Sequence, residues 1–122
     1  MSSSTMPLAH GAPALNDSQL VLLRDLLEAH RSFRCDQLDQ LRRAALLPGR
    51  TATDREINES LVTGAQAALR EVMQALRRMG DGSYGSCAHC FEPLPIERLE
   101  VLPQAALCMT CQHVVDRAAG AA

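Results

Sequence analysis

Four of the five cysteines in this 122-residue chain lie close together, as two Cys-x-x-Cys pairs near the C-terminal end. Seventeen residues separate the pairs. A Cys-x-x-Cys turn can direct two thiolates at one tetrahedral ion, and this separation is typical of four-cysteine zinc sites. The sequence therefore predicts one structural Zn²⁺ ion, with these ligands: Cys87, Cys90, Cys108 and Cys111.

A structural role suits these thiols better than a catalytic or a redox role. Catalytic zinc keeps an open coordination position and usually has His or carboxylate ligands. Thioredoxin-like redox chemistry needs a βαβ context, which neither pair has. His89 and His113 flank the pairs, but four cysteines already complete the shell, so we do not expect either as a ligand. The fifth cysteine, Cys35, is interpreted as a structural bystander.

Two long amphipathic stretches precede the cysteines. The first is expected to begin at Asn16 or Asp17, either of which can cap a helix, and to end near Leu47 before Pro48-Gly49. The second is expected to begin with a capping box, Thr53-Asp54-Arg55-Glu56, and to end at Gly80. The expected apolar stripes are Leu20, Leu23, Leu26, Leu27, Phe33, Leu38, Leu41, Ala44 and Ala45, then Ile57, Leu61, Gly64, Ala65, Ala68, Val72, Ala75, Leu76 and Met79.

These stretches predict a mainly α fold. Two helices of this length, joined by a short Pro-Gly turn, should form an antiparallel hairpin (a coiled coil) about 40 Å long. The chain has one Tyr, two Phe and no Trp, and this composition favours helices packed along a narrow seam. We expect a flexible tail over 1–15, the hairpin over 16–80 with its tip near 48–56, and a zinc module over 81–122 that ends in a short helix from 112 to 119.

Polar residues interrupt the first stripe in its middle. If the turn centres near residue 50, His30 and Arg34 lie opposite Glu71 and could pair with it. Alternatively, Arg34 and Gln37 lie along the edge of the seam, with their stems packed and their polar ends in water. Both interpretations fit the sequence.

Composition argues against several classes of protein. The formal net charge is −2, and four thiolates with Zn²⁺ lower it to about −4, which disfavours binding to nucleic acid. No apolar run reaches the roughly 20 residues that span a bilayer, and the first residues do not form a secretory signal. We therefore expect a cytoplasmic monomer. The four histidines are scattered with no nucleophile beside them, so we do not expect an enzyme.

The cysteine-rich segment resembles the DksA/TraR family of bacterial transcription regulators. The matching residues are Asp81-x-x-Tyr84-Gly85-x-Cys87-x-x-Cys90 and Ile96-x-Arg98-Leu99-Glu100-x-x-Pro103-x-Ala105-x-Leu107-Cys108-x-x-Cys111. The resemblance implies a protein that binds RNA polymerase without binding DNA. Its zinc module would dock at the rim of the secondary channel, and its hairpin would enter the channel with an acidic tip.

The chain departs from the family pattern at two places. At the tip, an Asp-x-x-Asp-x-Ala pattern is replaced by Thr51, Asp54 and Glu56, so only the second acid is kept. The basic positions that the family uses to contact the alarmone guanosine tetraphosphate fall on Glu71, Leu102 and Gln112, none of which is basic. We therefore expect no alarmone-binding residues. Asp54 has two interpretations, a carboxylate that acts in the channel and an acid that favours the start of a helix.

Three functions remain open at this point. The first is regulation of RNA polymerase through its secondary channel. The second is a zinc-stabilised protein-interaction module with a different partner, which the altered tip keeps open. The third is a zinc ribbon that binds nucleic acid, which would need a basic face.

Overall fold

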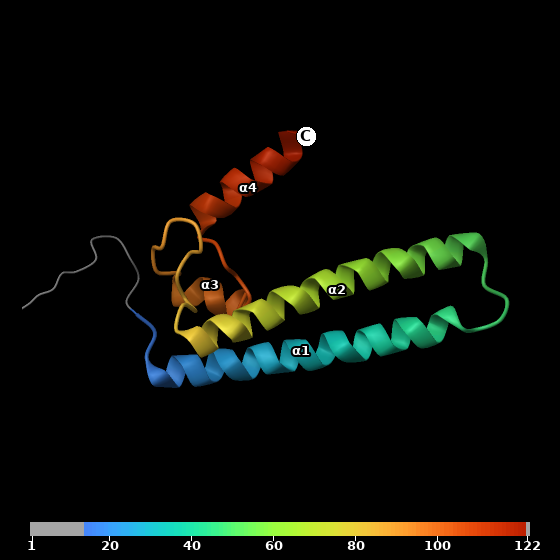
Figure 1. Ribbon diagram of the computed structural model, residues 1–122, viewed down its shortest axis with the longest axis horizontal. Helices are drawn as coiled ribbons and strands as arrows, with labels where there is room; N and C mark the ends of the chain where they lie inside the picture. Colours follow the sequence, from blue (N-terminus) through green and yellow to red (C-terminus); the bar gives the residue numbers. More distant parts are fainter. Residues whose placement is uncertain (1–13, 122) are drawn as a thin grey trace, which may run out of the picture.

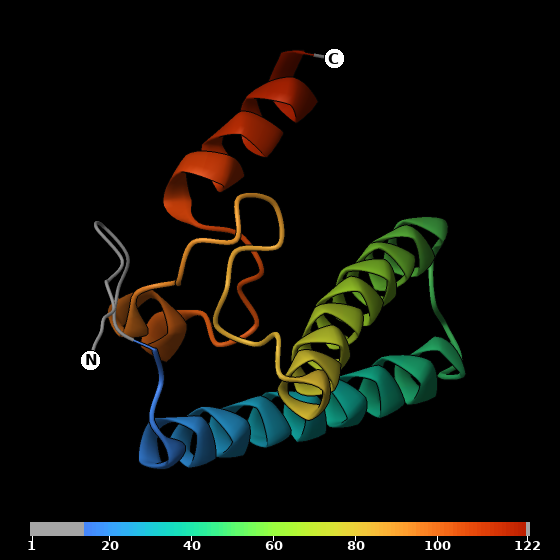
Figure 2. The same ribbon diagram turned by 60° about the vertical axis from the view of Figure 1, so that its left-hand side comes forward.

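The computed structural model describes residues 14–121, and its most extended feature is an antiparallel pair of long helices. These are α1 (Asp17–Ala45) and α2 (Ala52–Asp81), each about 45 Å long at 1.5 Å per residue. They lie side by side in Figure 1 and contact one another. In the turned view of Figure 2, α2 is foreshortened and overlaps α1. Two shorter helices follow, α3 (Ile96–Val101) and α4 (Met109–Ala121). The expected mainly α fold, a long hairpin followed by a cysteine-rich module, is confirmed.

Both long helices begin with a capping box. At α1, the Asn16 side chain accepts from the Gln19 backbone N–H at 2.8 Å, and the Gln19 side chain accepts from the Asn16 N–H at 2.9 Å. At α2, the same exchange joins Thr51 and Asp54, at 3.0 Å in each direction. The expected start of α1 is confirmed, whereas the capping box expected at Thr53 is wrong. Both threonines stand three residues before an acid, and the earlier one adds Ala52, a strong helix former, to the helix.

The turn between the long helices covers residues 46–51. α1 ends at Ala45, two residues before the expected end at Leu47. Pro48 gives the reason, because the residue before a proline is disfavoured in the helical conformation. Gly49 continues the turn with a positive φ of 78°. α2 ends at Asp81 and is followed by Gly82 in the left-handed conformation, the usual helix C-terminus.

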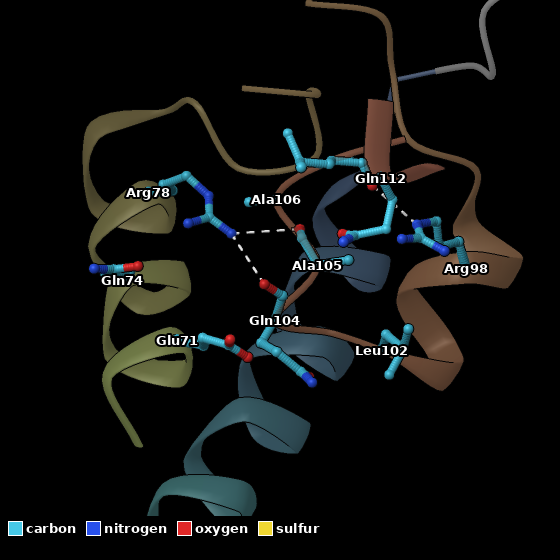
Figure 3. A pocket seen from close by; sticks show the side chains of 10 residues that line it. Glu71, Gln74, Arg78, Arg98, Leu102, Gln104, Ala105, Ala106 and Gln112 are labelled. Carbon is cyan, nitrogen blue, oxygen red and sulfur yellow. Dashed lines mark hydrogen bonds between the residues drawn. The ribbon is translucent and has the colours of Figure 1, made fainter. Parts of the chain in front are cut away.

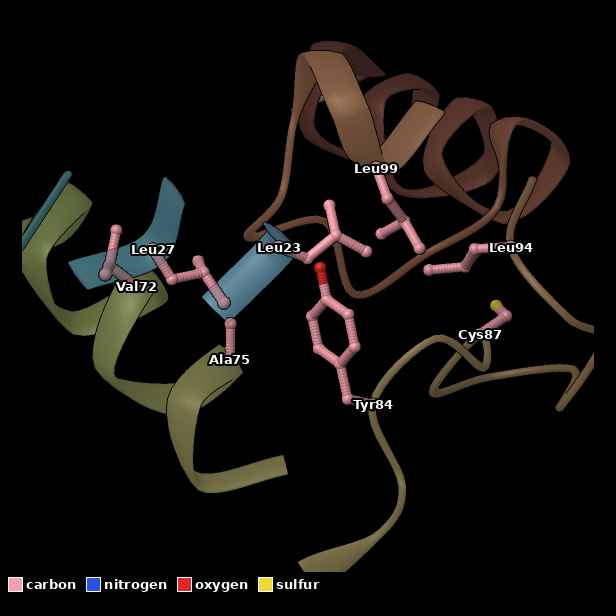
Figure 4. Close-up of a cluster of buried hydrophobic side chains, with 8 residues drawn as sticks. All are labelled: Leu23, Leu27, Val72, Ala75, Tyr84, Cys87, Leu94 and Leu99. Atoms are coloured by element: carbon pink, nitrogen blue, oxygen red, sulfur yellow. The ribbon is translucent and has the colours of Figure 1, made fainter. Parts of the chain in front are cut away.

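The main core contains residues near the start of α1 and near the end of α2, so it lies at the end of the hairpin away from this turn. Figure 4 shows its side chains. The core joins side chains of α1 and α2 to side chains of the zinc module. Its buried members are Leu23, Leu27, Val72, Ala75, Tyr84, Cys87, Leu94 and Leu99. The hairpin base and the zinc module therefore share one core. The side chains on the two sides of the expected boundary between residues 80 and 81 pack together.

The start of the described chain also packs against this core. Leu15 is half-buried and contacts the cluster. Leu15, expected in the flexible tail over 1–15, is therefore packed, whereas residues 1–13 of that segment lie outside the described residues. Within 14–121, no helix is both long enough and apolar enough to cross a bilayer.

The seam between the long helices is polar in its middle. His30, Arg34 and Gln37 are half-buried there, whereas Phe33 and Ile57, expected in the apolar stripes, are 61% and 55% exposed. The half-buried positions follow a spacing of alternating three and four residues, the 3.5 period of a coiled coil, and Phe33 falls outside it. Arg34 Nη1 donates to Gln37 Oε1 at 2.9 Å within its own helix. Of the two interpretations of Arg34, the edge of the seam is therefore correct, and the pair with Glu71 is not formed.

Candidate functional site: the four thiols, the hairpin tip and a pocket beside the zinc module

The four paired cysteines converge on one point. Their sulfur atoms all lie within 4.8 Å of one another, and Cys90 Sγ lies 3.8 Å from Cys108 Sγ. A tetrahedral Zn²⁺ ion with Zn–S bonds near 2.3 Å requires its sulfur ligands to stand about 3.8 Å apart. The thiols therefore fit zinc, and no described His or carboxylate joins the group. A four-thiolate shell has no open position, so the ion is structural.

The first cysteine pair lies in a tight loop held by backbone hydrogen bonds. The Cys87 N–H donates to Glu92 O at 2.8 Å, and the Phe91 N–H donates to Cys87 O at 2.9 Å. Inside this loop, the N–H groups of His89 and Cys90 lie 3.4 and 3.5 Å from Cys87 Sγ. Phe91 takes a positive φ of 66°, which turns the chain back after the second cysteine. N–H donors around a sulfur favour its thiolate, the form that binds metal.

Gly85 allows this loop to approach the start of the hairpin. Its φ is 93°, and a Cβ at this position would lie 3.0 Å from Leu15 Cδ1. Its carbonyl accepts from the Leu94 N–H at 2.7 Å, beside an isolated bridge between Ser86 and Pro93. A side chain at position 85 would therefore be strained by the positive φ, and Leu15 would have to shift to make room for it.

The second cysteine pair lies at the start of α4. The Gln112 N–H donates to Cys108 O at 2.8 Å, and the Cys111 N–H lies 3.4 Å from Cys108 Sγ. Cys108 thus stands directly before α4, and Cys111 lies in its first turn. The closing helix was expected from Gln112, but it begins at Met109, because the cysteine turn is also its first turn.

The protein environment does not favour ionising all four thiols without a metal. Burial raises the pKa of the Cys87 thiol, but N–H donors, including those of Cys90 and His89, outweigh burial and lower it to about 6. Burial and the neighbouring thiols raise the pKa of Cys111 to about 12. Zn²⁺ supplies the positive charge that lets the whole set deprotonate. His89 Nδ1 lies 3.6 Å from Cys111 Sγ, close to the site but outside the set of four thiols.

The turn at the hairpin tip lies at the opposite end of α1 and α2 from α3 and the start of α4 (Figure 1). Two of the expected tip residues, Thr51 and Asp54, form the capping box of α2, and the third, Glu56, is exposed. Hydrogen bonds from the backbone and the hydroxyl of Thr51 lower the pKa of Asp54, and Arg50 and Arg55 lower it further. Asp54 is therefore an ionised carboxylate, and one of its oxygens accepts from Thr51.

A pocket of 320 Å³ lies between α2 and the zinc module (Figure 3). Its lining includes Glu71, Leu102 and Gln112, the three positions where the family pattern has basic residues. Two arginines also line it. Arg78 Nη2 lies 3.4 Å from the carbonyl oxygens of Gln104 and Ala105, and Arg98 Nε donates to Leu107 O at 3.0 Å. Arg78 was not singled out from the sequence, because its partners stand 26 and 27 residues away.

Comparisons with known proteins agree with this architecture. The family model described as "Prokaryotic dksA/traR C4-type zinc finger" matches residues 82–117. The chain is 28% identical over 116 residues to the RNA polymerase-binding transcription factor DksA of Escherichia coli (strain K12), a match that covers 87% of this chain and 77% of that protein. It is 35% identical over 68 residues to general stress protein 16O of Bacillus subtilis (strain 168), covering 56% and 42%. The solved structure of transcription factor DksA2 from Pseudomonas aeruginosa is similar at a TM-score of 0.71 and 25% identity, covering 84% and 86%.

A helical hairpin whose base packs on a four-cysteine zinc module defines a class of small zinc-stabilised helical proteins. Within that class, the zinc module of this chain belongs to the DksA/TraR family of four-cysteine zinc fingers, and most of the chain is similar to DksA. The first two curated relatives are matched over only 42% and 50% of their own length, so the chain spans about half of each.

Proposed function

We propose that this protein is a transcription regulator that binds RNA polymerase, inserts its hairpin into the secondary channel, and acts without binding DNA. The similarity to the RNA polymerase-binding factor DksA is the observation that carries this proposal, because it covers 87% of the chain and so includes the hairpin as well as the zinc finger. A relative that shared the zinc module alone would say nothing about a channel-entering hairpin.

The form of the hairpin supports insertion into a narrow channel. Its distal part is two helices thick, and its tip carries exposed apolar side chains, Leu46 and Leu47, at 86% and 59% exposure. Exposed apolar groups at the end of a thin projection suit contact with a protein surface. The acidic formal charge, lower still with the zinc site formed, disfavours a DNA phosphate backbone as the partner.

Asp54 is the tip residue on which we expect the effect on transcription to depend. Its carboxylate is ionised, and it stands at the first turn of α2, where the chain reverses. Thr51 stands in the position of the missing acid, and its hydroxyl oxygen caps the helix by accepting from the Asp54 N–H. We therefore expect the tip to act through one carboxylate, with Glu56 as an exposed neighbour.

Co-purification tests the partner. The tagged chain is passed through extract of its own cells, and the large polymerase subunits are sought among the bound proteins. A photo-crosslinker at Leu47 should attach to polymerase, whereas one at Arg77, on the exposed face near the base of α2, should give less product at the channel. If polymerase does not bind at micromolar concentration, the alternative of a zinc-stabilised interaction module with another partner replaces this proposal.

A gel shift tests the absence of DNA binding separately. The purified protein is mixed with duplex DNA at moderate salt, with and without polymerase. A shift of free DNA by this chain alone would overturn that part of the proposal.

A further inference from the structure

Residues 103–107, which we call the strap, form no helix or strand, yet each of their carbonyl groups has a hydrogen-bond partner. The strap runs between the end of α3 and Cys108, with the sequence Pro-Gln-Ala-Ala-Leu. A backbone carbonyl that is removed from water without a donor costs free energy, so an irregular segment in this place needs donors from elsewhere.

The donors come from three different parts of the chain. The Tyr84 hydroxyl donates to Pro103 O at 2.7 Å, and this hydrogen bond is buried. Arg78 Nη2, from α2, donates to the next two carbonyls at 3.4 Å (Figure 3). The Ala88 N–H, inside the first cysteine loop, donates to Ala106 O at 2.7 Å. Arg98 Nε, from α3, donates to Leu107 O at 3.0 Å.

The strap thus connects the hairpin to both cysteine pairs. Its last residue precedes the zinc ligand Cys108, and Ala88 follows the zinc ligand Cys87. Among the strap's side-chain donors, Arg78 alone comes from the hairpin. A Zn²⁺ ion bound to Cys108 would restrain the end of the strap and, through it, the two carbonyls that Arg78 contacts. Loss of the ion would remove this restraint.

We propose that the strap couples zinc occupancy to the stability of the hairpin base, with Arg78 as the positioning residue that makes the connection. The coupling is reciprocal: zinc protects the base of α2, and Arg78 slows the loss of zinc. The inference is independent of polymerase binding, because both ends of the connection lie within this chain.

Amide hydrogen exchange in the full chain, with and without zinc, tests the coupling. The reporter is the base of α2, residues 72–77. Zinc removal should lower the exchange protection of residues 72–77 in both proteins, and the loss in the parent should exceed the loss in Arg78→Met by at least about tenfold. The reason is that a hydrogen bond from a charged donor is worth about that factor. Arg77→Met removes an exposed arginine next to it, and this variant should behave as the parent. Arg78→Lys keeps a charged donor and should recover part of the difference.

The rate of zinc loss to a chelator provides the second measurement. Arg78→Met should bind one zinc per chain but lose it about tenfold faster than Arg77→Met. If Arg78→Met does not fold, Tyr84→Phe, which keeps the ring in the core and removes only the donor to Pro103, should show the faster loss instead. Equal effects of zinc on the protection of α2 in the parent and Arg78→Met would overturn the proposal, as would zinc-loss rates within twofold of the parent in the variants that fold.

Discussion

Replacing Leu99 by alanine tests whether the zinc module and the hairpin fold on one core. Leu99 belongs to α3, is fully buried, and lies in the same cluster as Leu23 and Leu27 of α1. The substitution removes three carbon groups, each worth about 0.8 kcal/mol of burial. The cavity that remains raises the cost to about 3–4 kcal/mol. This is a large part of the roughly 5–15 kcal/mol by which a domain of this size is stable.

The assay is thermal unfolding followed by far-ultraviolet circular dichroism. Most of the helical signal comes from α1 and α2, whereas the substitution is in the zinc module. If the core is shared, the melting temperature of the helical signal should fall by about 10 °C or more. Val101→Ala is the matched control, because Val101 is on the same short helix but is 74% exposed, and its cost should stay below about 0.5 kcal/mol.

Two results would refute a shared core. In the first, the helical melt of Leu99→Ala overlays that of Val101→Ala. In the second, the parent itself unfolds in two separate steps, and Leu99→Ala moves only the smaller one. Either result would mean that the hairpin is stable without the zinc module, despite the packing in Figure 4.

Three further predictions follow from the thiols, the tip and the pocket. Metal analysis should find one zinc per chain, and Cys87→Ser should lose it and unfold the zinc module, because three thiolates do not complete the shell; a folded, zinc-free module would contradict this. Asp54→Asn should retain polymerase binding but weaken the effect on transcription, while Glu59→Gln, an exposed acid further along α2, should not; equal regulation by Asp54→Asn at saturating protein would reduce Asp54 to a helix-capping role. With a polymerase that lacks its other alarmone site, guanosine tetraphosphate should not change transcription through this protein. Glu71 repels phosphates, and both pocket arginines already donate to carbonyl oxygens. Clear potentiation that requires this chain would show that an arginine is available to the nucleotide.

Local patterns in the sequence were enough to find the zinc site and the start of the hairpin. A Cys-x-x-Cys pair brings its own two ligands together within one turn, so the metal site needed little knowledge of the fold. The capping box at Asn16 is equally local. The predicted start of α2 is wrong because Thr51 and Thr53 each stand three residues before an acid, and the choice between them depends on the neighbouring turn.

Features that depend on distant partners could not be found in this way. α3 is six residues long and has no side-chain cap, so it gives almost no periodic signal. It is placed by the burial of Leu99 against the hairpin. The sequence pattern predicts Phe33 in the apolar stripe because the residue is apolar, but the 3.5-residue spacing of the seam leaves it exposed. The contacts of Arg78 could not be predicted from the sequence, since its partners are backbone carbonyls, which every residue carries.

The position of the main core has a mechanical consequence for the tip. The side chains shared with the zinc module lie at one end of a hairpin about 45 Å long, so the tip stands at the far end of a lever. A rotation of about 5° at the base displaces the far end of such a lever by about 4 Å, which is comparable to the length of a side-chain contact. A substitution that repacks Leu27 or Val72 can therefore move Asp54 out of reach of a partner without altering any residue of the tip.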